Sequence, residues 1–171
     1  KLREELKVKS IQDSLTGLAN RSHMEEILQR QFYRMLRYKT PCSLIMLDVD
    51  HFKRFNDTYG HDMGDYVLRE LGAYLKDNTR GEDLACRYGG EEFVIIMVAT
   101  EIENAQKKAE RIRAGIAEVI TIPYLSEILH VTVSVGVATS PLHAQSAKGL
   151  FKAADNALYR AKENGRNRVE V

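Results

Sequence analysis

The segment CRYGGEEFVIIM, Cys86–Met97, places two glycines and two glutamates between apolar residues typical of strands. This pattern indicates a β-hairpin, because glycine adopts the positive φ of a tight turn without steric cost. A turn alone does not require adjacent carboxylates at its mouth. Glu91 and Glu92 therefore suggest that the hairpin also takes part in binding or chemistry.

The composition narrows the class of protein. The 171 residues are enough for one substantial core, and we expect a single domain. The 25 Lys and Arg residues nearly balance the 24 Asp and Glu residues, so we expect no binding to nucleic acid, and any anionic ligand must be held locally. The longest apolar run, Phe93–Ala99, is far shorter than the roughly 20 residues that cross a bilayer. We therefore expect a cytoplasmic domain that makes no membrane contact.

The hydrophobic pattern predicts alternating helices and strands. Apolar residues recur at spacings of three and four in the predicted helices, and β-branched residues dominate the predicted strands. The predicted order is a helix at 22–38, a strand through 44–47, a helix at 63–78, the hairpin, a helix at 102–119, a strand at 129–139, a final helix carrying Leu150 to Ala161, and an edge strand in GRNRVEV. Strand, helix, two strands, helix, strand is the order of ferredoxin-like α+β folds, in which helices pack on one mixed sheet.

The first residues have a different character. Residues 1–12 carry charges around Leu2, Leu6 and Ile11, and we expect them to be the end of a linker helix that enters from an upstream sensory or regulatory domain. Residues 13–171 then form the folded domain.

Four carboxylates stand at the expected strand ends. Asp48 and Asp50 end a buried strand on one face if the strand stays regular, and one of Glu91 and Glu92 can join them. Such a cluster is repulsive unless a hard divalent cation neutralises it. Solvated turn residues, or ion pairs with Arg87 and Lys53, explain the same pattern without a metal.

Several other polar residues have two interpretations. Lys162 and Arg166 flank the end of the last helix, where cations bind phosphate or simply complement the helix dipole. Asp62 and Asp65 sit where a helix begins, so N-capping is their ordinary role. Asn56 is by default a turn residue.

Six motifs identify a resemblance that covers nearly the whole chain. They are DSLTGLANR, LDVDHFKRFNDTYGH, GDYVLRE, RYGGEEF, VTVSVGVA and ADNALYRAKENGRNR, in this order. With these motifs the chain resembles the GGDEF-domain diguanylate cyclases, and GGEEF is an accepted form of their signature. The resemblance implies a core similar to the adenylyl cyclases and the polymerase palm. It also implies condensation of two GTP into cyclic di-GMP with release of two pyrophosphates.

The resemblance assigns roles to individual residues. It implies a Mg²⁺ or Mn²⁺ site formed by Asp48, the Val49 carbonyl and Glu91, with Glu91 also accepting the proton of the attacking 3′-hydroxyl. Glu92 and Lys53 complete the implied catalytic set. Residues implied in substrate binding are Phe52, Asn56, His61, Asp65, Gly89, Gly90, Lys162 and Arg166, of which Asn56 and Asp65 recognise guanine.

The resemblance also implies regulation and assembly. Arg80 and Asp83 match the RxxD pattern of a product-inhibition site, and Arg111 matches a further arginine of that site, although a loop salt bridge also explains RGED. Arg34 or Arg37 of a neighbouring domain is expected to complete it. Each domain binds one GTP, so catalysis requires a two-fold homodimer. A nucleotide receptor without turnover, or a cyclase acting on another nucleotide, are the competing functions.

Overall fold

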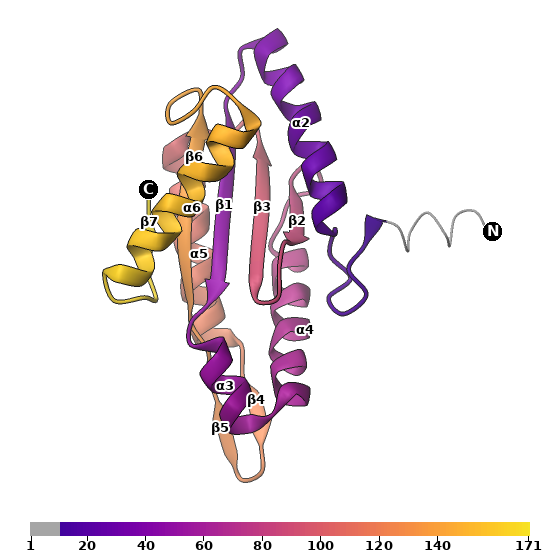
Figure 1. The fold of residues 1–171 in the computed structure, drawn as a ribbon, viewed down its shortest axis with the longest axis vertical. Coiled ribbons are helices and arrows are strands. Elements are labelled where there is room, and N and C mark those ends of the chain that lie inside the picture. The colour runs from indigo at the N-terminus through magenta and orange to yellow at the C-terminus, as the bar shows by residue number, and fades with distance from the viewer. Residues whose placement is uncertain (1–10) are drawn as a thin grey trace, which may run out of the picture.

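A five-stranded sheet forms the centre of the computed structural model, which describes residues 11–171 (Figure 1). Its order is β2-β3-β1-β6-β7, with antiparallel neighbours except for the parallel β6–β7 pair. The strands are β1 (Cys42–Val49), β2 (Leu84–Arg87), β3 (Glu92–Val98), β6 (Val133–Ser140) and β7 (Val169–Glu170). A separate small hairpin is formed by β4 (Ile122–Tyr124) and β5 (Glu127–Leu129).

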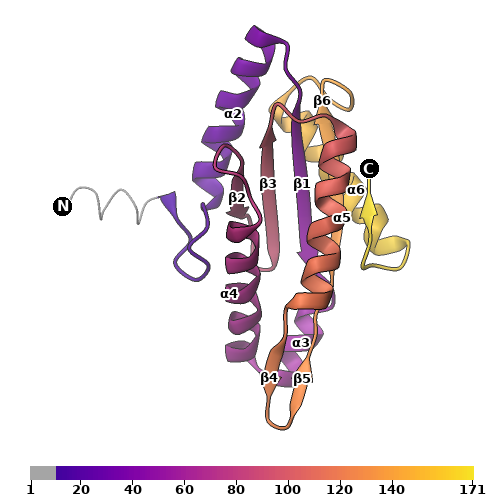
Figure 2. The ribbon, with the colours of Figure 1, turned by 180° about the vertical axis from the view of Figure 1, so that it is seen from behind.

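Helices cover both faces of this sheet. They are α2 (Arg21–Tyr38), α3 (Phe52–Tyr59), α4 (His61–Asp77), α5 (Ile102–Val119) and α6 (Ala147–Glu163). Figure 1 shows α2 and α6 on one face, and Figure 2 shows α4 and α5 on the other. The order β1, α3–α4, β2, β3, α5, β6 confirms the predicted ferredoxin-like α+β arrangement.

Burial of β1 explains its unbroken apolar sequence. All eight of its residues are buried, because the strand lies inside the sheet and helices cover both faces. Ile45 and Leu47 belong to the core beneath α4 and α5, whereas Leu44 and Met46 belong to the core beneath α2 and α6. The two cores hold the end of β1 in place from both sides.

The structure differs from the sequence prediction in three respects. Helix α3 was not predicted, and neither was the β4–β5 hairpin. The strand predicted at 129–139 begins instead at Val133, because Leu129 belongs to β5. The closing edge strand is confirmed as β7. Most of the predicted linker helix at 1–12 lies outside the described residues.

One edge of the sheet is partly covered by the segment before α2. Ala19 forms an isolated parallel bridge with Cys86 in β2. The Ala19 amide donates to the Ala85 carbonyl at 3.2 Å, and the Arg87 amide donates to the Ala19 carbonyl at 3.0 Å. At the other edge, β7 is only two residues long. Among residues 11–171, no helix has the length and apolar character needed to cross a membrane.

Strand β6 and helix α6 approach each other closely at Gly136. A Cβ added there would lie 2.2 Å from the Ala154 carbonyl oxygen and 2.3 Å from the Leu158 amide nitrogen. Both atoms are backbone atoms, so no side-chain rotation can relieve the clash.

We expect Gly136→Ala to lower the free energy of unfolding by about 1–3 kcal/mol, the usual cost of overpacking a core. Urea denaturation followed by circular dichroism measures this. Gly81→Ala is the matched control, because a Cβ there meets nothing within 4 Å. Equal unfolding midpoints for the two variants would contradict the packing described here.

Candidate active site

The end of β1 meets the hairpin that enters β3. Asp48 pairs directly with Glu92 in the antiparallel register, and the Val49 amide donates to the Glu91 carbonyl at 3.2 Å. Side chains directly opposite in such a pair have Cβ atoms about 4.5–5.5 Å apart. The predicted convergence of the β1 carboxylate with the hairpin acids is therefore present in the backbone pairing.

Asp48 is buried and contacts a lysine from α6. Its residue is 7% exposed, and the Lys162 ammonium in the last turn of α6 donates to its Oδ2 at 2.9 Å. Burial raises the pKa of Asp48 from 3.8 to about 6, against the lowering effect of Lys162 and with further raising by Glu91 and Glu92. Both hairpin acids thus act on Asp48, and the site carries more negative charge than one lysine neutralises.

The two hairpin glycines do not have the backbone conformation that was expected of them. Neither Gly89 nor Gly90 is among the glycines with positive φ, so the expectation of a turn that needs positive φ is wrong. A Cβ on Gly89 would lie 2.6 Å from Glu92 Oε2, whereas a Cβ on Gly90 would meet nothing within 4 Å. Gly89 therefore leaves room for the Glu92 carboxylate, and Gly90 leaves the turn open.

Arg87 fixes the shape of this turn. Its guanidinium donates to the carbonyls of Gly89 and Gly90, the latter at 2.9 Å, and pairs with Asp13 at 3.2 Å. Burial raises the pKa of Asp13, but hydrogen bonds from Thr16 and the charge and hydrogen bond of Arg87 lower it below its usual value. The alternative in which Arg87 neutralises the hairpin glutamates is not what the described contacts show.

Asp50 does not join the acid cluster. Strand β1 ends at Val49, and the buried Asp50 carboxylate accepts hydrogen bonds from Thr132 Oγ1, Ser134 Oγ and the Asn167 amide at 2.6, 2.6 and 3.0 Å. The expectation of a regular strand with both aspartates on one face is therefore wrong. Asp50 instead ties the start of β6 to the loop after α6, which carries Arg166.

The residues predicted to bind guanine lie on the corner between α3 and α4. Asn56 belongs to α3 rather than to a turn, and its buried Oδ1 has no hydrogen-bond partner within residues 11–171. Asp65 is exposed and lies inside α4, whose N-cap is Gly60, so N-capping does not explain it. Of the other predicted substrate residues here, Phe52 is buried at the start of α3, and Lys53 and His61 are exposed.

The predicted phosphate cations lie at the end of α6. Lys162 contacts Asp48, so its role goes beyond complementing the helix dipole. Arg166 is exposed in the loop that follows, with a left-handed φ of 62° and its amide donating to the Ala161 carbonyl at 2.9 Å.

The donors at the end of β1 suit a hard divalent cation. Asp48 and Glu91 offer carboxylate oxygens, and the Val49 carbonyl is the predicted third donor. Within the described part of the chain, no three His, Cys, Asp or Glu side chains form a group able to hold a metal ion. An ion at this place would thus depend on the carbonyl and on oxygens of a bound ligand.

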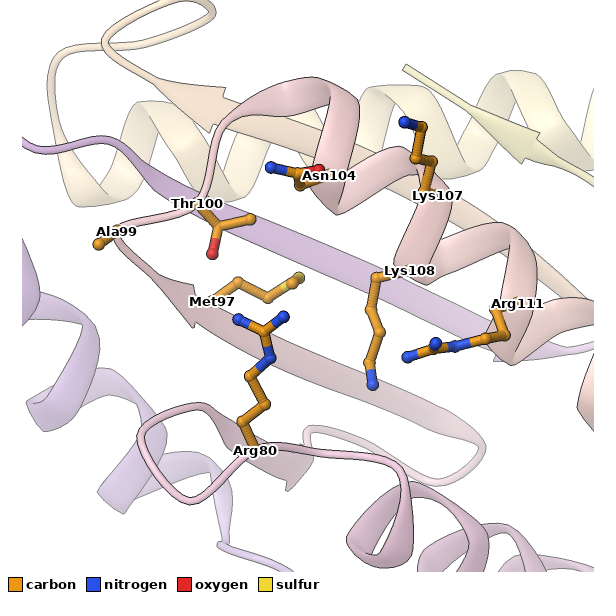
Figure 3. Close-up of a pocket in the computed structure, with 8 residues that line it drawn as sticks. All are labelled: Arg80, Met97, Ala99, Thr100, Asn104, Lys107, Lys108 and Arg111. Atoms are coloured by element: carbon orange, nitrogen blue, oxygen red, sulfur yellow. The ribbon is translucent and has the colours of Figure 1, made fainter.

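A second, cationic pocket lies at the opposite end of β3 (Figure 3). It has a volume of about 430 Å³. Its lining residues are Arg80, Met97, Ala99, Thr100, Asn104, Lys107, Lys108 and Arg111. The predicted pair Arg80 and Arg111 is brought together here, and two lysines that the sequence analysis did not single out join it.

The charges of this pocket repel one another. Burial lowers the pKa of Lys108, and Arg111 and Arg80 lower it further, while Asp83 opposes them. Asp83 does not line the pocket. Its buried carboxylate accepts from the Val98 amide at 3.0 Å and so fixes the loop that carries Arg80. A cluster of cations without matching anions fits a phosphate ligand.

The arginines expected from a neighbouring domain lie on α2. Arg34 lines a separate pocket with Val98 and Ala99, and the Arg37 guanidinium lies 5.5 Å from the Tyr38 ring centroid. Their predicted contribution to the cationic pocket stays a prediction.

The chain matches a known protein family and several named relatives. The family model described as "Diguanylate cyclase, GGDEF domain" matches residues 10–168. The response regulator PleD of Caulobacter vibrioides is 44% identical over 94% of this chain and 36% of its own length. Diguanylate cyclase A of Treponema denticola is 41% identical over 93% of this chain and 43% of its own length. The chain thus spans less than half of these relatives.

Solved structures agree in fold. The coiled coil and GGDEF domain of DgcB from Caulobacter crescentus, in complex with c-di-GMP, is 32% identical with a TM-score of 0.92, covering 99% of this chain and 89% of that one. The active GGEEF domain of a diguanylate cyclase from Vibrio cholerae is 35% identical with a TM-score of 0.83, covering 90% of this chain and 96% of that one.

The raised pKa of Asp48 predicts a cost in stability at neutral pH. Between about pH 4 and 6 the folded protein holds a proton that the unfolded chain has released, so this group's contribution to the unfolding free energy falls as pH rises. One pKa unit corresponds to about 1.4 kcal/mol. We therefore expect Asp48→Asn to stabilise the protein by about 1–3 kcal/mol at pH 7.5, with the gain shrinking toward pH 4.

Urea titrations across this pH range, in buffer containing a chelator, measure the effect. Asp57→Asn is the control, because Asp57 is exposed on α3. A destabilised Asp48→Asn protein at pH 7.5, or a pH-independent difference, would show that burial does not dominate this site.

Proposed function

Because the chain belongs to the GGDEF family of diguanylate cyclases, we propose that it condenses two GTP into cyclic di-GMP and releases two pyrophosphates. The observation that carries this proposal is the pairing of Asp48 with Glu92 beside Glu91, next to a lysine from α6. Attack on an α-phosphorus requires acids that can hold a divalent metal ion and a cation that can neutralise phosphate, and both are found at this strand end.

The reaction is mainly a problem of position and charge. In each half-reaction a 3′-oxygen attacks an α-phosphorus, a new P–O bond forms, and the bond to the pyrophosphate breaks. Glu91 accepts the hydroxyl proton. Lys53, Lys162 and Arg166 neutralise the triphosphate, and Glu92 supports the acid cluster. A Mg²⁺ or Mn²⁺ ion held by Asp48, Glu91 and the Val49 carbonyl would supply charge stabilisation at the phosphate oxygens.

Guanine recognition rests on the corner between α3 and α4. Asp65 accepts hydrogen bonds from the N1 and N2 groups of guanine, an edge that adenine does not offer. Asn56 packs against Gly64, the residue before Asp65, and its buried carbonyl oxygen lacks a partner in the described part of the chain. A site built to pair polar groups rejects a base that leaves them unpaired.

Two domains are required because each holds one GTP. We place them in a two-fold antiparallel homodimer, so that each 3′-hydroxyl reaches the nucleotide of the partner. A regulatory segment that changes how two domains meet would then control the rate. One solved relative includes a coiled coil and another is bound to an activator protein, which supports control of the rate by a segment or partner outside the domain.

The cationic pocket is the proposed site of product inhibition. Arg80 and Arg111 bind the phosphates of cyclic di-GMP and stack on its bases, which a planar guanidinium does better than an ammonium. Lys108 adds a third cation at the same pocket. Solved structures of two relatives describe a GGDEF domain with c-di-GMP, which supports a product site in this family.

We expect Glu91→Gln to reduce formation of cyclic di-GMP by about 10²–10⁴-fold, the usual contribution of a general base. Purified protein is incubated with GTP and Mg²⁺, and the products are separated by chromatography. Exposed Glu118 on α5 gives the control Glu118→Gln. The wild-type rate per molecule should rise with protein concentration.

Other outcomes of the same incubation decide between functions. GTP binding without turnover in the wild type would identify a receptor, and consumption of ATP would indicate another cyclase. Full-speed turnover by Glu91→Gln would remove Glu91 from its proposed role.

We expect Arg80→Ala to weaken inhibition by cyclic di-GMP about 10–100-fold, because a hydrogen bond to a charged group contributes about 1.5–3 kcal/mol. Turnover without added product should stay unchanged. Arg69→Ala, on the exposed side of α4, is the control. Inhibition that is equal in both variants would rule out this pocket.

A further inference from the structure

Gly64 is an unusual residue for its position. It is buried in the first turns of α4, where glycine costs about 0.5–1 kcal/mol relative to alanine. Its φ is not among the positive values, so the backbone does not require glycine there. The reason must lie in the space that a side chain would occupy.

That space is filled by Asn56. A Cβ on Gly64 would lie 1.8 Å from Asn56 Oδ1, 2.8 Å from Asn56 Cγ and 3.2 Å from Phe52 Cζ. Gly60 joins the two helices here: its amide donates to the Asn56 carbonyl at 2.8 Å, and its carbonyl accepts from the Gly64 amide at 3.2 Å. The Asn56 amide group therefore sits directly against the backbone of α4.

This contact decides which end of the Asn56 amide is offered to a ligand. The Oδ1 end is buried against Gly64 and has no hydrogen-bond partner within residues 11–171. The NH₂ end, on the other side of Cγ, is not among the buried unpaired atoms. A carbonyl oxygen is also the better end to bury, because an NH₂ group would leave two donors unpaired.

The next residue completes the pattern. Asp65 follows Gly64 on α4 and is exposed. Its carboxylate is a hydrogen-bond acceptor, and it lies one residue from the glycine that contacts Asn56, whose NH₂ group is a donor. Guanine presents an acceptor, O6, beside the N1–H and N2–H₂ donors. Adenine presents a donor in place of O6.

We propose that Gly64 is a specificity-determining positioning residue: its missing side chain seats Asn56 Oδ1 against α4 and directs the amide NH₂ toward guanine. The proposal rests on guanine-nucleotide binding at this corner, as proposed above. Gly64 touches no ligand itself and acts through Asn56. Selectivity for guanine would then explain why a residue that lowers helix stability stands at this position.

A double-mutant cycle tests the proposal on four proteins: the wild type, Gly64→Ala, Asn56→Ala and the double variant. Dissociation constants for a non-hydrolysable GTP analogue and for the corresponding ATP analogue are measured by calorimetry with Mg²⁺. We expect Gly64→Ala to weaken binding of the GTP analogue about tenfold, the value of one hydrogen bond lost at a buried site. ATP-analogue binding should change less, so the ratio between the two falls.

The background without Asn56 separates positioning from damage. Once the Asn56 amide is absent, Gly64→Ala should change GTP-analogue binding less than twofold. Urea denaturation should show that the Gly64→Ala protein unfolds cooperatively. In the double variant the clash between the new Cβ and the Asn56 side chain is absent, so this protein is the less strained of the two. Steady-state kinetics should show a raised KM for GTP with kcat changed less than about threefold.

Two results would overturn the proposal. One is unchanged GTP-analogue affinity in Gly64→Ala, and the other is an equal loss in the presence and absence of the Asn56 side chain. Chromatography of the reaction products judges the cyclase activity separately. If the wild type makes cyclic di-GMP but the effects of Gly64→Ala and Asn56→Ala on GTP-analogue affinity are independent, only the positioning role is disproved. If the two effects depend on each other but no cyclic di-GMP forms, only the cyclase activity is disproved.

Discussion

The register between β1 and β3 is the constraint on which the rest of the structure depends. Seven residue pairs run from Cys42 opposite Val98 to Asp48 opposite Glu92. A slip by one residue would turn every side chain of β3 to the other face, exchanging the two cores and separating the acids. The apolar residues that fix this register thereby also bring the acids at its end together, so packing supplies the energy that charge repulsion opposes.

Much of the architecture follows from local pattern, and the failures have physical causes. The periodic helices, the buried central strand and the edge strand were predicted, because each has a long or strongly alternating pattern. Helix α3 was missed because a segment of eight residues is too short to show a clear helical period. Local pattern could not predict the contact of Lys162 with Asp48, because the two residues are far apart in the chain. It could not predict the role of Gly89 either, because that role depends on where the Glu92 carboxylate lies in the folded hairpin.

Strand β3 connects two sites of opposite charge. Its first residue, Glu92, belongs to the acid cluster, and Met97 near its other end lines the cationic pocket. At about 3.3 Å per residue the strand separates Glu92 from Met97 by roughly 17 Å. The formal charge of +1 therefore hides two local charge clusters of opposite sign. Since β3 is buried and paired on both sides, the distance between the two sites is fixed.

The cover over β2 has a consequence for solubility. An open edge strand offers unpaired amides and carbonyls to the edge of another molecule, which is a route to aggregation. Ala19 takes up the Ala85 carbonyl and the Arg87 amide on one side of the sheet, and β7 ends the other side after two residues. Both edges of the sheet thus offer few open backbone groups, which disfavours indiscriminate strand pairing between copies of the domain.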